Sequence, residues 1–513
     1  MRRCRRARVR ALGCCLMLAA AVAGAAGCGS EARAPTQLAP APHTPVPAEQ
    51  AWAAPNADAA NTRRVGGPID AASVARLRPV WRIPLSVSYT ATAVISGDVA
   101  YTQDSLSDVY AIDVGSGRLR WKTRFHSPDQ GPNGVAVVDK RVYGATNDSA
   151  FALDQETGRL LWRRKLKRHF TEGIDMAPGE QNGIVYVSTV PAGGGDVATL
   201  WALDGATGGV RWRWEEVPAS LWGNPQLNGG GGMWHPPAFD DDGGLYAAIA
   251  NPVPWPGTEE APWGRSRPGP NRWNNSLVKL DARTGRFLWG RQVLPHDLYD
   301  WDLQCPPILA RVDGRRVVLT AGKMGFVFAF DAETGRLLWK RSVGIHNGHD
   351  DDSVRAMHGD YSRVGYGRRI YPGDWGGVQT QLGSDGRTLY VPVNNLYAIY
   401  QAQTVPTQQD PAKGTGELVA LDIATGQLRW ATRLPHGIYG GASIANDVIF
   451  TTTYDGTVWA FHTRTGEQLW SAPLPAGSIA PVTIAGDTVI AGASLPVARG
   501  RRLAIVAYRL GVR

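Results

Sequence analysis

A group of histidines and aspartates after the middle of the chain has the residue types that could hold a metal ion. His346 and His349 are followed directly by Asp350, Asp351 and Asp352. Imidazole nitrogens and carboxylate oxygens both ligate metal cations. A run of three acidic residues is also typical of a solvated loop, and the sequence favours this second interpretation.

Tryptophans are concentrated between Trp212 and Trp289, where stacking chemistry could occur. The residues concerned are Trp222, Trp255, Trp263 and Trp273. Indole rings can stack on a sugar or a polymer, but packing inside the protein is the favoured interpretation. The sequence contains no Cys-x-x-Cys-His haem-attachment motif, no P-loop and no Ser-centred hydrolase motif. Any electrons that the chain handles would therefore leave through a separate acceptor.

A repeated pattern supplies the elements that must position any such site. It consists of an apolar residue, Asp, two variable positions, Thr or Ser, Gly, three more residues and Trp, as in Asp113, Gly117 and Trp121. Further copies begin at Asp154, Asp204, Asp281, Asp331, Asp422 and, with His in place of Asp, His462. Trp81 stands 40 residues before Trp121 and marks an eighth unit.

Each repeat predicts a strand, a tight turn and a second strand. The apolar residues before Asp113 form the first strand. Asp can bond nearby amides, and Gly can adopt the positive φ of the turn, while Trp packs on the neighbouring sheet. Such a unit cannot bury both faces alone, so repeats stack into a ring. The sequence therefore predicts an all-β, eight-bladed β-propeller with tryptophan-docking repeats, in which the strand at 503–508 closes the ring with N-terminal strands.

The N-terminal residues predict export. Residues 1–10 contain six arginines and no acidic residue, and the apolar run 11–26 follows them. These are the charged and apolar regions of a signal peptide, and the run is short for a membrane-spanning helix. We expect residues 1–27 to be a lipoprotein signal peptide, residues 28–55 a Pro/Ala-rich tether and residues 56–513 the propeller.

Net charge and cysteine content limit the partners and the cross-links. The formal net charge is +9, of which six charges lie in residues 1–10. The remaining charge of about +3 gives no basic surface for a nucleic acid. Of the five cysteines, only Cys28 and Cys305 lie outside the predicted signal peptide.

The segment Ala25-Ala26-Gly27-Cys28 resembles a bacterial lipoprotein box. This resemblance implies that Cys28 is lipidated and that the protein is extracytoplasmic and anchored to a membrane surface. An ordinary cleaved signal peptide is the alternative. With Cys28 lipidated, Cys305 has no partner for an internal disulfide.

The repeats, together with the segment before them, resemble the propellers of the pyrroloquinoline quinone (PQQ) type quinoproteins. Trp52 is followed by Asp58-Ala59-Ala60-Asn61-Thr62-Arg63 and then by Leu77-Arg78-Pro79-Val80-Trp81. The resemblance runs from about Trp52 to the C-terminus. It implies a PQQ-dependent alcohol or sugar dehydrogenase, although propellers of the same repeat family without catalytic activity also exist.

The resemblance implies a floor and a metal ligand for the cofactor. Residues 229–233, a glycine run ending in Met, resemble the segment before the Trp that stacks on PQQ, which is Trp234 here. Asn251, in Asn251-Pro252, matches a metal-binding Asn, and an amide oxygen suits a hard cation. The alternatives are a structural Trp at the end of a blade and a simple Asn-Pro turn.

The resemblance also implies the reacting groups. Asp300 matches the catalytic base and also a metal ligand. Asp302 lies two positions further, on the same side of an extended strand, where lanthanide-using members carry an additional carboxylate ligand. Lys323 matches the cation that approaches the quinone oxygens. Turn-capping aspartates and an exposed hairpin lysine are the alternatives.

Other positions depart from the family pattern. Gln379 and Tyr439 stand at cofactor-binding positions where Asn and Trp are usual. Thr90 and Gly193 stand where the family has two glutamates, one of them a metal ligand. Residues 133–136 lack the adjacent cysteines that cover PQQ in many members and the Arg beside them.

Two hypotheses follow. The first is a PQQ-dependent dehydrogenase that uses Ca²⁺ or a lanthanide and an external electron acceptor. The second is a propeller lipoprotein without a cofactor that binds a protein or a polysaccharide, like the outer-membrane assembly propeller of the same repeat family. Asn251 and Asp300 favour the first hypothesis, whereas Thr90, Gly193 and the missing disulfide favour the second.

Overall fold

The computed structural model describes residues 46–47, 50–129, 131–401, 407–497 and 502–511. Nearly all regular structure in these ranges is β-strand, with one short α-helix and three 3-10 helices. The predicted all-β class is therefore confirmed. The expected signal peptide, the lipidation site Cys28 and most of the tether lie outside the described residues.

Eight sheets in the described ranges contain four or five strands. The first sheet consists of β3 (Val94–Ser96), β4 (Val99–Gln103), β5 (Val109–Asp113) and β6 (Leu119–Thr123), and the second of β7 (Val135–Val138), β8 (Arg141–Ala145), β9 (Ser149–Asp154) and β10 (Leu160–Lys165). The third consists of β11 (Gly179–Gln181), β12 (Ile184–Ser188), β13 (Thr199–Asp204) and β14 (Val210–Glu215), and the fourth of β16 (Ala238–Phe239), β17 (Gly244–Ile249), β19 (Ser276–Asp281) and β20 (Phe287–Gln292).

The remaining four sheets include two N-terminal strands. The fifth sheet consists of β21 (Ile308–Val312), β22 (Arg315–Ala321), β23 (Phe326–Asp331) and β24 (Leu337–Ser342), and the sixth of β26 (Gly383–Ser384), β27 (Thr388–Asn395), β30 (Thr415–Asp422) and β31 (Leu428–Leu434). The seventh consists of β32 (Ser443–Ala445), β33 (Val448–Thr452), β34 (Thr457–His462) and β35 (Gln468–Pro473), with β1 (Arg64–Val65) parallel to β32. The eighth consists of β36 (Thr483–Ala485), β37 (Thr488–Ala493) and β38 (Ala504–Leu510), with β2 (Leu77–Pro84) beside β38.

The turn predicted from the repeat is present between the last two strands of the second sheet. The Asp154 carboxylate accepts hydrogen bonds from the backbone N–H and the hydroxyl of Thr157, at 2.9 and 2.7 Å. Gly158 has φ +71°, and a Cβ there would lie 2.6 Å from the Trp121 ring. Glycine is therefore required both for the backbone conformation and for the close approach of Trp121.

The predicted tryptophan docking is also confirmed. Trp121, on β6, donates its indole N–H to the carbonyl of Gln155, the residue directly after the Asp anchor of the next repeat. The same bond to the same position is made by Trp81, Trp162, Trp212, Trp289, Trp339 and Trp430. Each ring thus covers the turn of the following sheet and satisfies its own polar atom there.

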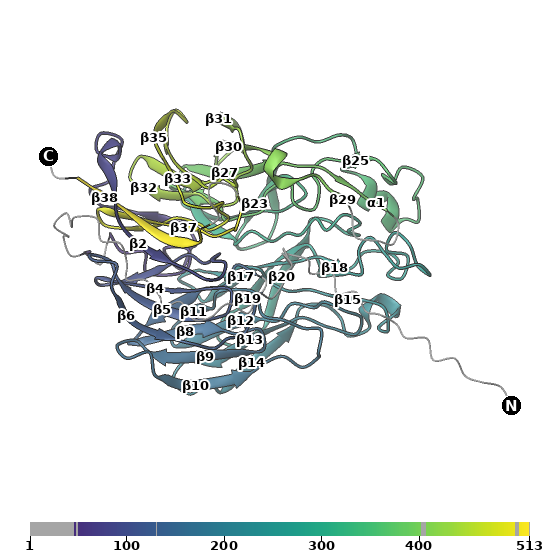
Figure 1. Cartoon of the computed structure of the whole chain (residues 1–513). Helices are drawn as coiled ribbons and strands as arrows, with labels where there is room; N and C mark the ends of the chain where they lie inside the picture. The colour runs from purple at the N-terminus through teal and green to yellow at the C-terminus, as the bar shows by residue number, and fades with distance from the viewer. Residues whose placement is uncertain (1–45, 48–49, 130, 402–406, 498–501, 512–513) are drawn as a thin grey trace, which may run out of the picture.

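Successive sheets meet along their first strands. Strand β3 lies beside β7, β7 beside β11, β16 beside β21, β21 beside β26, β26 beside β32, and β32 beside β36. The Thr483 hydroxyl on β36 donates to the carbonyl of Ala93, directly before β3. The C-terminal β38 pairs antiparallel with the N-terminal β2, as predicted for residues 503–508. Figure 1 shows the yellow β37 and β38 next to the purple β2.

The segment at 52–63, which precedes the strands of the first sheet, makes backbone hydrogen bonds to several sheets in turn. Its carbonyl groups accept hydrogen bonds from five different sheets, through the amides of Ile95, Phe239, Leu309, Ser384 and Ile444. The fully buried Arg63 completes the crossing, because its guanidinium donates to the Asn56 side chain, the Ser443 hydroxyl and the Ala442 carbonyl. The segment therefore joins sheets that are far apart in the sequence.

Small elements lie mainly in the connections between these sheets. They are the strand pair β15 (Gly229–Gly230) and β18 (Pro252–Val253), the three-stranded β25 (Arg369–Ile370), β28 (Ala398–Ile399) and β29 (Thr407–Gln408), the α-helix α1 (Asp352–Met357), and the 3-10 helices η2 (Val74–Arg76), η3 (Leu221–Gly223) and η4 (Pro411–Lys413). None of the helices in the described ranges has the length and hydropathy needed to cross a bilayer.

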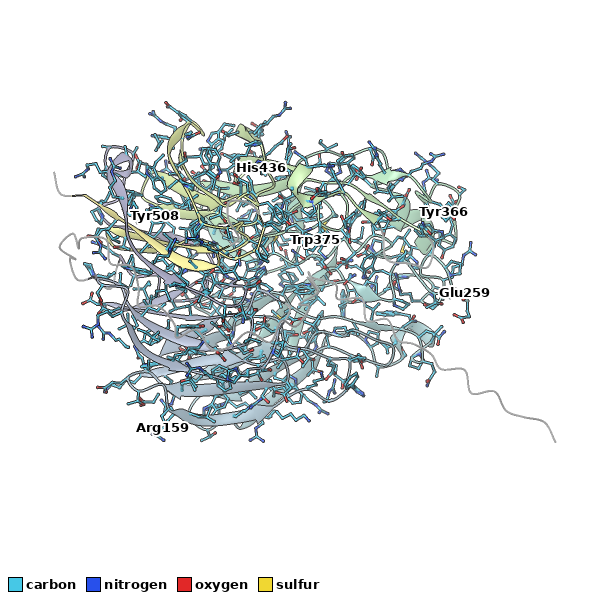
Figure 2. All side chains as sticks on the ribbon, in the orientation of Figure 1. Arg159, Glu259, Tyr366, Trp375, His436 and Tyr508 are labelled. Atoms are coloured by element: carbon cyan, nitrogen blue, oxygen red, sulfur yellow. The ribbon has the colours of Figure 1, made fainter. Side chains whose placement is uncertain are left out.

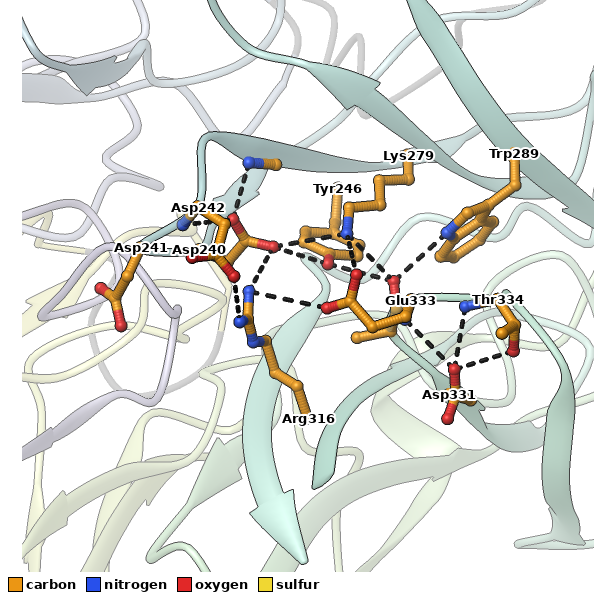
Figure 3. A network of polar contacts seen from close by, with 12 residues as sticks. Asp240, Asp241, Asp242, Tyr246, Lys279, Trp289, Arg316, Asp331, Glu333 and Thr334 are labelled. Carbon is orange, nitrogen blue, oxygen red and sulfur yellow. Dashed lines mark hydrogen bonds and ion pairs between the residues drawn. The ribbon is translucent and has the colours of Figure 1, made fainter. Parts of the chain in front are cut away.

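An ionic network joins the fourth and fifth sheets (Figure 3). Arg316 lies 2.7 Å from the Asp240 carboxylate, and Lys279 lies 3.5 Å from Asp240 and 3.2 Å from Glu333. Burial acts to raise the pKa of Asp240, but hydrogen bonds from Gly244 and Tyr246 and the two cations hold it below its ordinary value. The network therefore keeps Asp240 ionised between the sheets.

Candidate functional site

A cavity of about 170 Å³ brings together residues that are far apart in the sequence. Trp234, Asn251, Asp300, Lys323, Gln379 and Tyr439 all line it. They lie on separate connections between strands, so only the tertiary structure makes them neighbours. Trp375 lines the same cavity and lies near the middle of the molecule in Figure 2.

Asp300 connects the polar residues of the cavity. One of its carboxylate oxygens accepts a hydrogen bond from the Asn251 amide at 2.7 Å, and the other accepts one from the Lys323 ammonium at 2.7 Å. Burial raises the pKa of Asp300 well above its ordinary value, and the charge of Lys323 opposes this effect. The arrangement holds a carboxyl group with raised proton affinity at the cavity surface.

Asp302 lies behind this group and not on the described lining of the cavity. Its carboxylate lies 2.7 Å from the Lys323 ammonium and accepts the backbone N–H of Asn251 at 2.8 Å. The expectation of an extended strand is wrong, because Asp300 has φ +58°, yet both carboxylates reach the same ammonium. The exposed-hairpin interpretation of Lys323 is also wrong, since the residue is 6% exposed. The metal-ligand role of Asp302 stays a prediction.

The His/Asp group supports the residue next to Asp300. Asp352 is fully buried on α1, accepts the Tyr299 hydroxyl at 2.5 Å and lies 2.8 Å from His349 Nδ1. The solvated-loop interpretation is therefore wrong for Asp352. Within the described ranges, no group of three or more His, Cys, Asp or Glu side chains is arranged to hold a metal. The contacts fix Tyr299, and with it the backbone that carries Asp300.

The four tryptophans of the 212–289 region have different surroundings. Trp263 contacts Tyr299 edge-on at a centroid distance of 6.5 Å, and Trp273 stacks on Phe287 at 5.3 Å. The Trp222 indole donates to the carbonyl of Arg272. These three contact other parts of the protein, whereas Trp255 lines the cavity beside Asn251.

Gln379 and Tyr439 fix the loop at 374–376. The Gln379 amide donates to the carbonyls of Asp374 and Gly376, at 3.0 and 2.8 Å. The Tyr439 hydroxyl donates to the carbonyl of Trp375 at 3.1 Å, and burial raises the pKa of Tyr439. Both residues therefore line the cavity and position its Asp374–Trp375 wall.

Thr90 and Gly193, which stand where the resembling family has glutamates, lie in different places relative to the cavity. Thr90 lines the cavity, where its hydroxyl donates to the Gly131 carbonyl at 3.1 Å. Gly193 does not belong to the described lining, which contains the apolar Val190 and Pro191 instead. Neither position supplies a carboxylate to the cavity.

Asp374 was not predicted from the sequence. This residue lines the cavity, is 6% exposed, and has a buried Oδ1 without a hydrogen-bond partner among the described residues. Burial raises its pKa to about 7, against the charge of Lys323. Its only sequence signal is a place five residues before Gln379, between glycines, which does not distinguish it from a turn residue.

Glu216 lies under the glycine run that leads to Trp234. One carboxylate oxygen accepts the Gly232 N–H at 2.6 Å and the other accepts the Ser188 hydroxyl at 2.5 Å. Burial raises the pKa of Glu216 to about 7. The folded protein therefore retains a proton that the unfolded chain releases near pH 4.5.

We expect the contribution of Glu216 to stability to fall as pH rises from about 4.5 to about 7, because in this range the Glu216 carboxyl group holds its proton in the folded state and loses it in the unfolded state. Glu216→Gln should reduce this pH dependence by about 1–3 kcal/mol. Urea unfolding at pH 5 and pH 8 measures the effect. Glu215→Gln, at the partly exposed neighbouring residue, is the control and should behave like the wild type. An unchanged pH dependence in Glu216→Gln would contradict the assignment.

Two family models match separate parts of the chain. Residues 191–342 match the model described as "Glucose/ethanol/alcohol dehydrogenase, beta-propeller domain". Residues 362–511 match the model described as "Outer membrane protein assembly factor BamB". Both matched segments consist of the repeated sheets described above and their connections.

Curated relatives include two quinohemoprotein alcohol dehydrogenases. The chain is 28% identical to ADH-IIG of Pseudomonas putida over 468 residues, which cover 76% of this chain and 64% of that protein. It is 31% identical to the enzyme of Comamonas testosteroni over 300 residues, which cover 51% of this chain and 42% of that protein. The chain thus spans less than two thirds of the length of these relatives.

Solved structures show the same fold. The structure of ADH-IIG from P. putida HK5 matches with a TM-score of 0.79 at 24% identity, covering 90% of this chain and 80% of that one. A europium-containing methanol dehydrogenase matches with a TM-score of 0.75 at 20% identity, covering 90% and 98%. The fold is therefore that of the quinoprotein β-propellers, and the matched family models and relatives support a place for the chain in the PQQ-type quinoprotein family.

Proposed function

We propose that the chain is a dehydrogenase that oxidises a CH–OH group with PQQ and a hard cation. The observation that carries this proposal is the set of 2.7 Å contacts that join Asn251, Asp300 and Lys323 at the wall of a cavity that Trp234 also lines. Similarity to proteins named as quinohemoprotein alcohol dehydrogenases supports the same reaction class.

The residues present fit the two groups. Asn251 and Asp300 offer the oxygen donors that Ca²⁺ and lanthanide ions prefer, and Asp302 adds a carboxylate directly behind them. Trp234 offers a flat aromatic face, and its indole nitrogen is buried without a partner among the described residues. Lys323, Gln379 and Tyr439 would complete the cofactor contacts.

In the proposed reaction, Asp300 accepts the proton of the substrate hydroxyl. PQQ, when bound, would supply the two-electron oxidant, a quinone able to accept a hydride, for conversion of the alcohol to a carbonyl compound. Lys323 holds Asp300 in position and places a positive charge beside the reacting groups. The raised pKa of Asp300, caused by burial, suits it to the role of base.

A titration of the purified protein with PQQ tests the proposal. We expect retention of about one PQQ per chain in the presence of Ca²⁺ or a lanthanide, because the cavity supplies ligands for one cation and one aromatic floor. The bound cofactor is measured by its absorbance after gel filtration, with Trp234→Ala as the variant that should lose it. Lack of retention with both metals would refute a PQQ enzyme.

A second candidate is a non-catalytic propeller that binds a protein or a polysaccharide. The match of residues 362–511 to an outer-membrane assembly factor model favours it, as does the absence of a carboxylate at Thr90 and Gly193 in the cavity. This candidate predicts that PQQ is not retained. The titration therefore separates the two functions.

We further propose the architecture and location that accompany either function. The eight larger sheets would form one closed eight-bladed ring over residues 56–513, supported by the Thr483–Ala93 bond and the β2–β38 pair. Residues 1–27 would be the signal peptide and 28–55 the tether, with Cys28 lipidated and the protein held extracytoplasmically at the membrane surface. Electrons would pass to an external acceptor.

A further inference from the structure

Asp374 is a cavity carboxyl group that the proposed oxidation does not use. Its side chain is 6% exposed, and its buried Oδ1 accepts no hydrogen bond within the described ranges. A buried carboxyl oxygen without a partner raises the free energy of the protein. A ligand that donates a hydrogen bond to Asp374 would remove this cost.

Lys323 acts on Asp374 through its charge, but its short contacts are with two other carboxylates. Its ammonium lies 2.7 Å from a carboxylate oxygen of Asp300 and 2.7 Å from one of Asp302. His235, which also lines the cavity, is neutral at pH 7 because burial lowers its pKa to about 3. The ammonium group of a ligand would donate the hydrogen bond that the buried Oδ1 of Asp374 lacks in the described ranges and would stabilise the ionised carboxylate.

Aromatic rings lie next to the carboxyl group. Trp375 and Tyr439 both line the cavity and contact each other edge-on at a centroid distance of 6.2 Å. The hydrogen bonds from Tyr439 to the Trp375 carbonyl and from Gln379 to the Asp374 carbonyl fix this wall. Aromatic faces combined with a carboxylate are the usual surroundings of a bound alkylammonium group.

We propose that Asp374 and the ring of Trp375, whose backbone Tyr439 holds in place, form a subsite for the protonated or quaternary amine of a ligand. Because Asp300 lines the same cavity, a ligand with its amine at Asp374 can present a hydroxyl group to Asp300. The substrate class is then an amino alcohol, a conclusion that rests on the proposed dehydrogenase function. The amine subsite itself does not depend on that function.

Calorimetric titration of the purified full chain, without PQQ or added metal, tests the subsite. The probes are choline and 3,3-dimethyl-1-butanol, which has the same shape without the charge. We expect choline to bind about tenfold or more tightly than the neutral alcohol. Asp374→Asn should reduce this preference to less than about twofold, since it removes the charge and retains the shape. Asp241→Asn, at a carboxylate with 95% side-chain exposure, is the matched control and should retain the preference.

Three results would overturn the proposal: equal affinity of the wild type for both probes, no binding of choline up to about 100 mM, or a retained preference in Asp374→Asn. If Asp374→Asn does not fold, the wild-type comparison still decides, together with Trp375→Leu, which should weaken choline binding. A preference for choline without PQQ retention would refute only the dehydrogenase. PQQ retention without the preference would refute only the amine subsite.

Discussion

Asp300→Asn is expected to lower the PQQ- and metal-dependent rate of alcohol oxidation by about 10²–10⁴-fold. Asparagine has the shape of aspartate and can still accept a hydrogen bond from Lys323 or Asn251, but it cannot take the proton of the substrate hydroxyl. The amide also removes one of the two carboxylates that lie 2.7 Å from the buried ammonium of Lys323. The rate is measured as reduction of an artificial acceptor dye by the PQQ-loaded protein.

Two controls make the Asp300→Asn result specific. Asp241→Asn changes an exposed carboxylate on the fourth sheet and should leave the rate unchanged. A thermal melt of Asp300→Asn should show a cooperative transition, which excludes global unfolding as the cause of the lost rate. A rate within about threefold of the wild type, in a folded variant with bound PQQ, would exclude Asp300 as the base.

Arg63→Ala should destabilise the folded protein by about 3–5 kcal/mol, or prevent folding. Arg63 is fully buried, and its guanidinium makes hydrogen bonds to Asn56, Ala442 and Ser443 and lies 4.8 Å from the Trp52 ring centroid. Alanine leaves the carbonyl and amide partners buried without donors, in the segment that joins five sheets. Burial lowers the pKa of Arg63 to about 9, so the side chain is still charged at pH 7. The measurement is the midpoint of urea unfolding.

The neighbouring residue provides the control for Arg63. Arg64→Ala removes the same functional group from an exposed side chain that makes one long hydrogen bond, 3.3 Å, to the Asp385 carbonyl. We expect it to change the free energy of unfolding by less than about 0.5 kcal/mol. Equal urea midpoints for Arg63→Ala and Arg64→Ala would show that the crossing segment does not join the sheets energetically.

The repeat allowed most of the fold to be predicted, because each copy contains the residues that form its own turn and its contact with the next copy. Asp154 and Gly158 specify a turn through local hydrogen bonds and a positive φ, and Trp121 specifies the contact to the next turn. These interactions are local or join neighbouring repeats, so regular spacing along the chain reveals them. The role of Arg63 was not predicted, because its partners lie 7, 379 and 380 positions away.

The cavity shows the limit of the same reasoning. Resemblance to a family selected Trp234, Asn251, Asp300 and Lys323, and the structure brings them to one cavity, but their chemical roles stay predictions. Asp374 was missed because nothing in its local sequence indicates burial or a missing hydrogen-bond partner. The two aspartates of the 300–302 segment reach one ammonium through a left-handed residue, a geometry that the expected strand did not contain.

The sequence by itself determined the all-β class, the repeated turn and the docking of each tryptophan, because short-range bonds and periodic apolar residues encode them. Only the tertiary structure decided which side chains line the cavity and that the Lys323 ammonium contacts the carboxylates of both Asp300 and Asp302. It also decided that the buried Oδ1 of Asp374 has no hydrogen-bond partner in the described ranges. Burial and charge balance depend on groups from distant parts of the chain, so they exist only once the sheets have assembled.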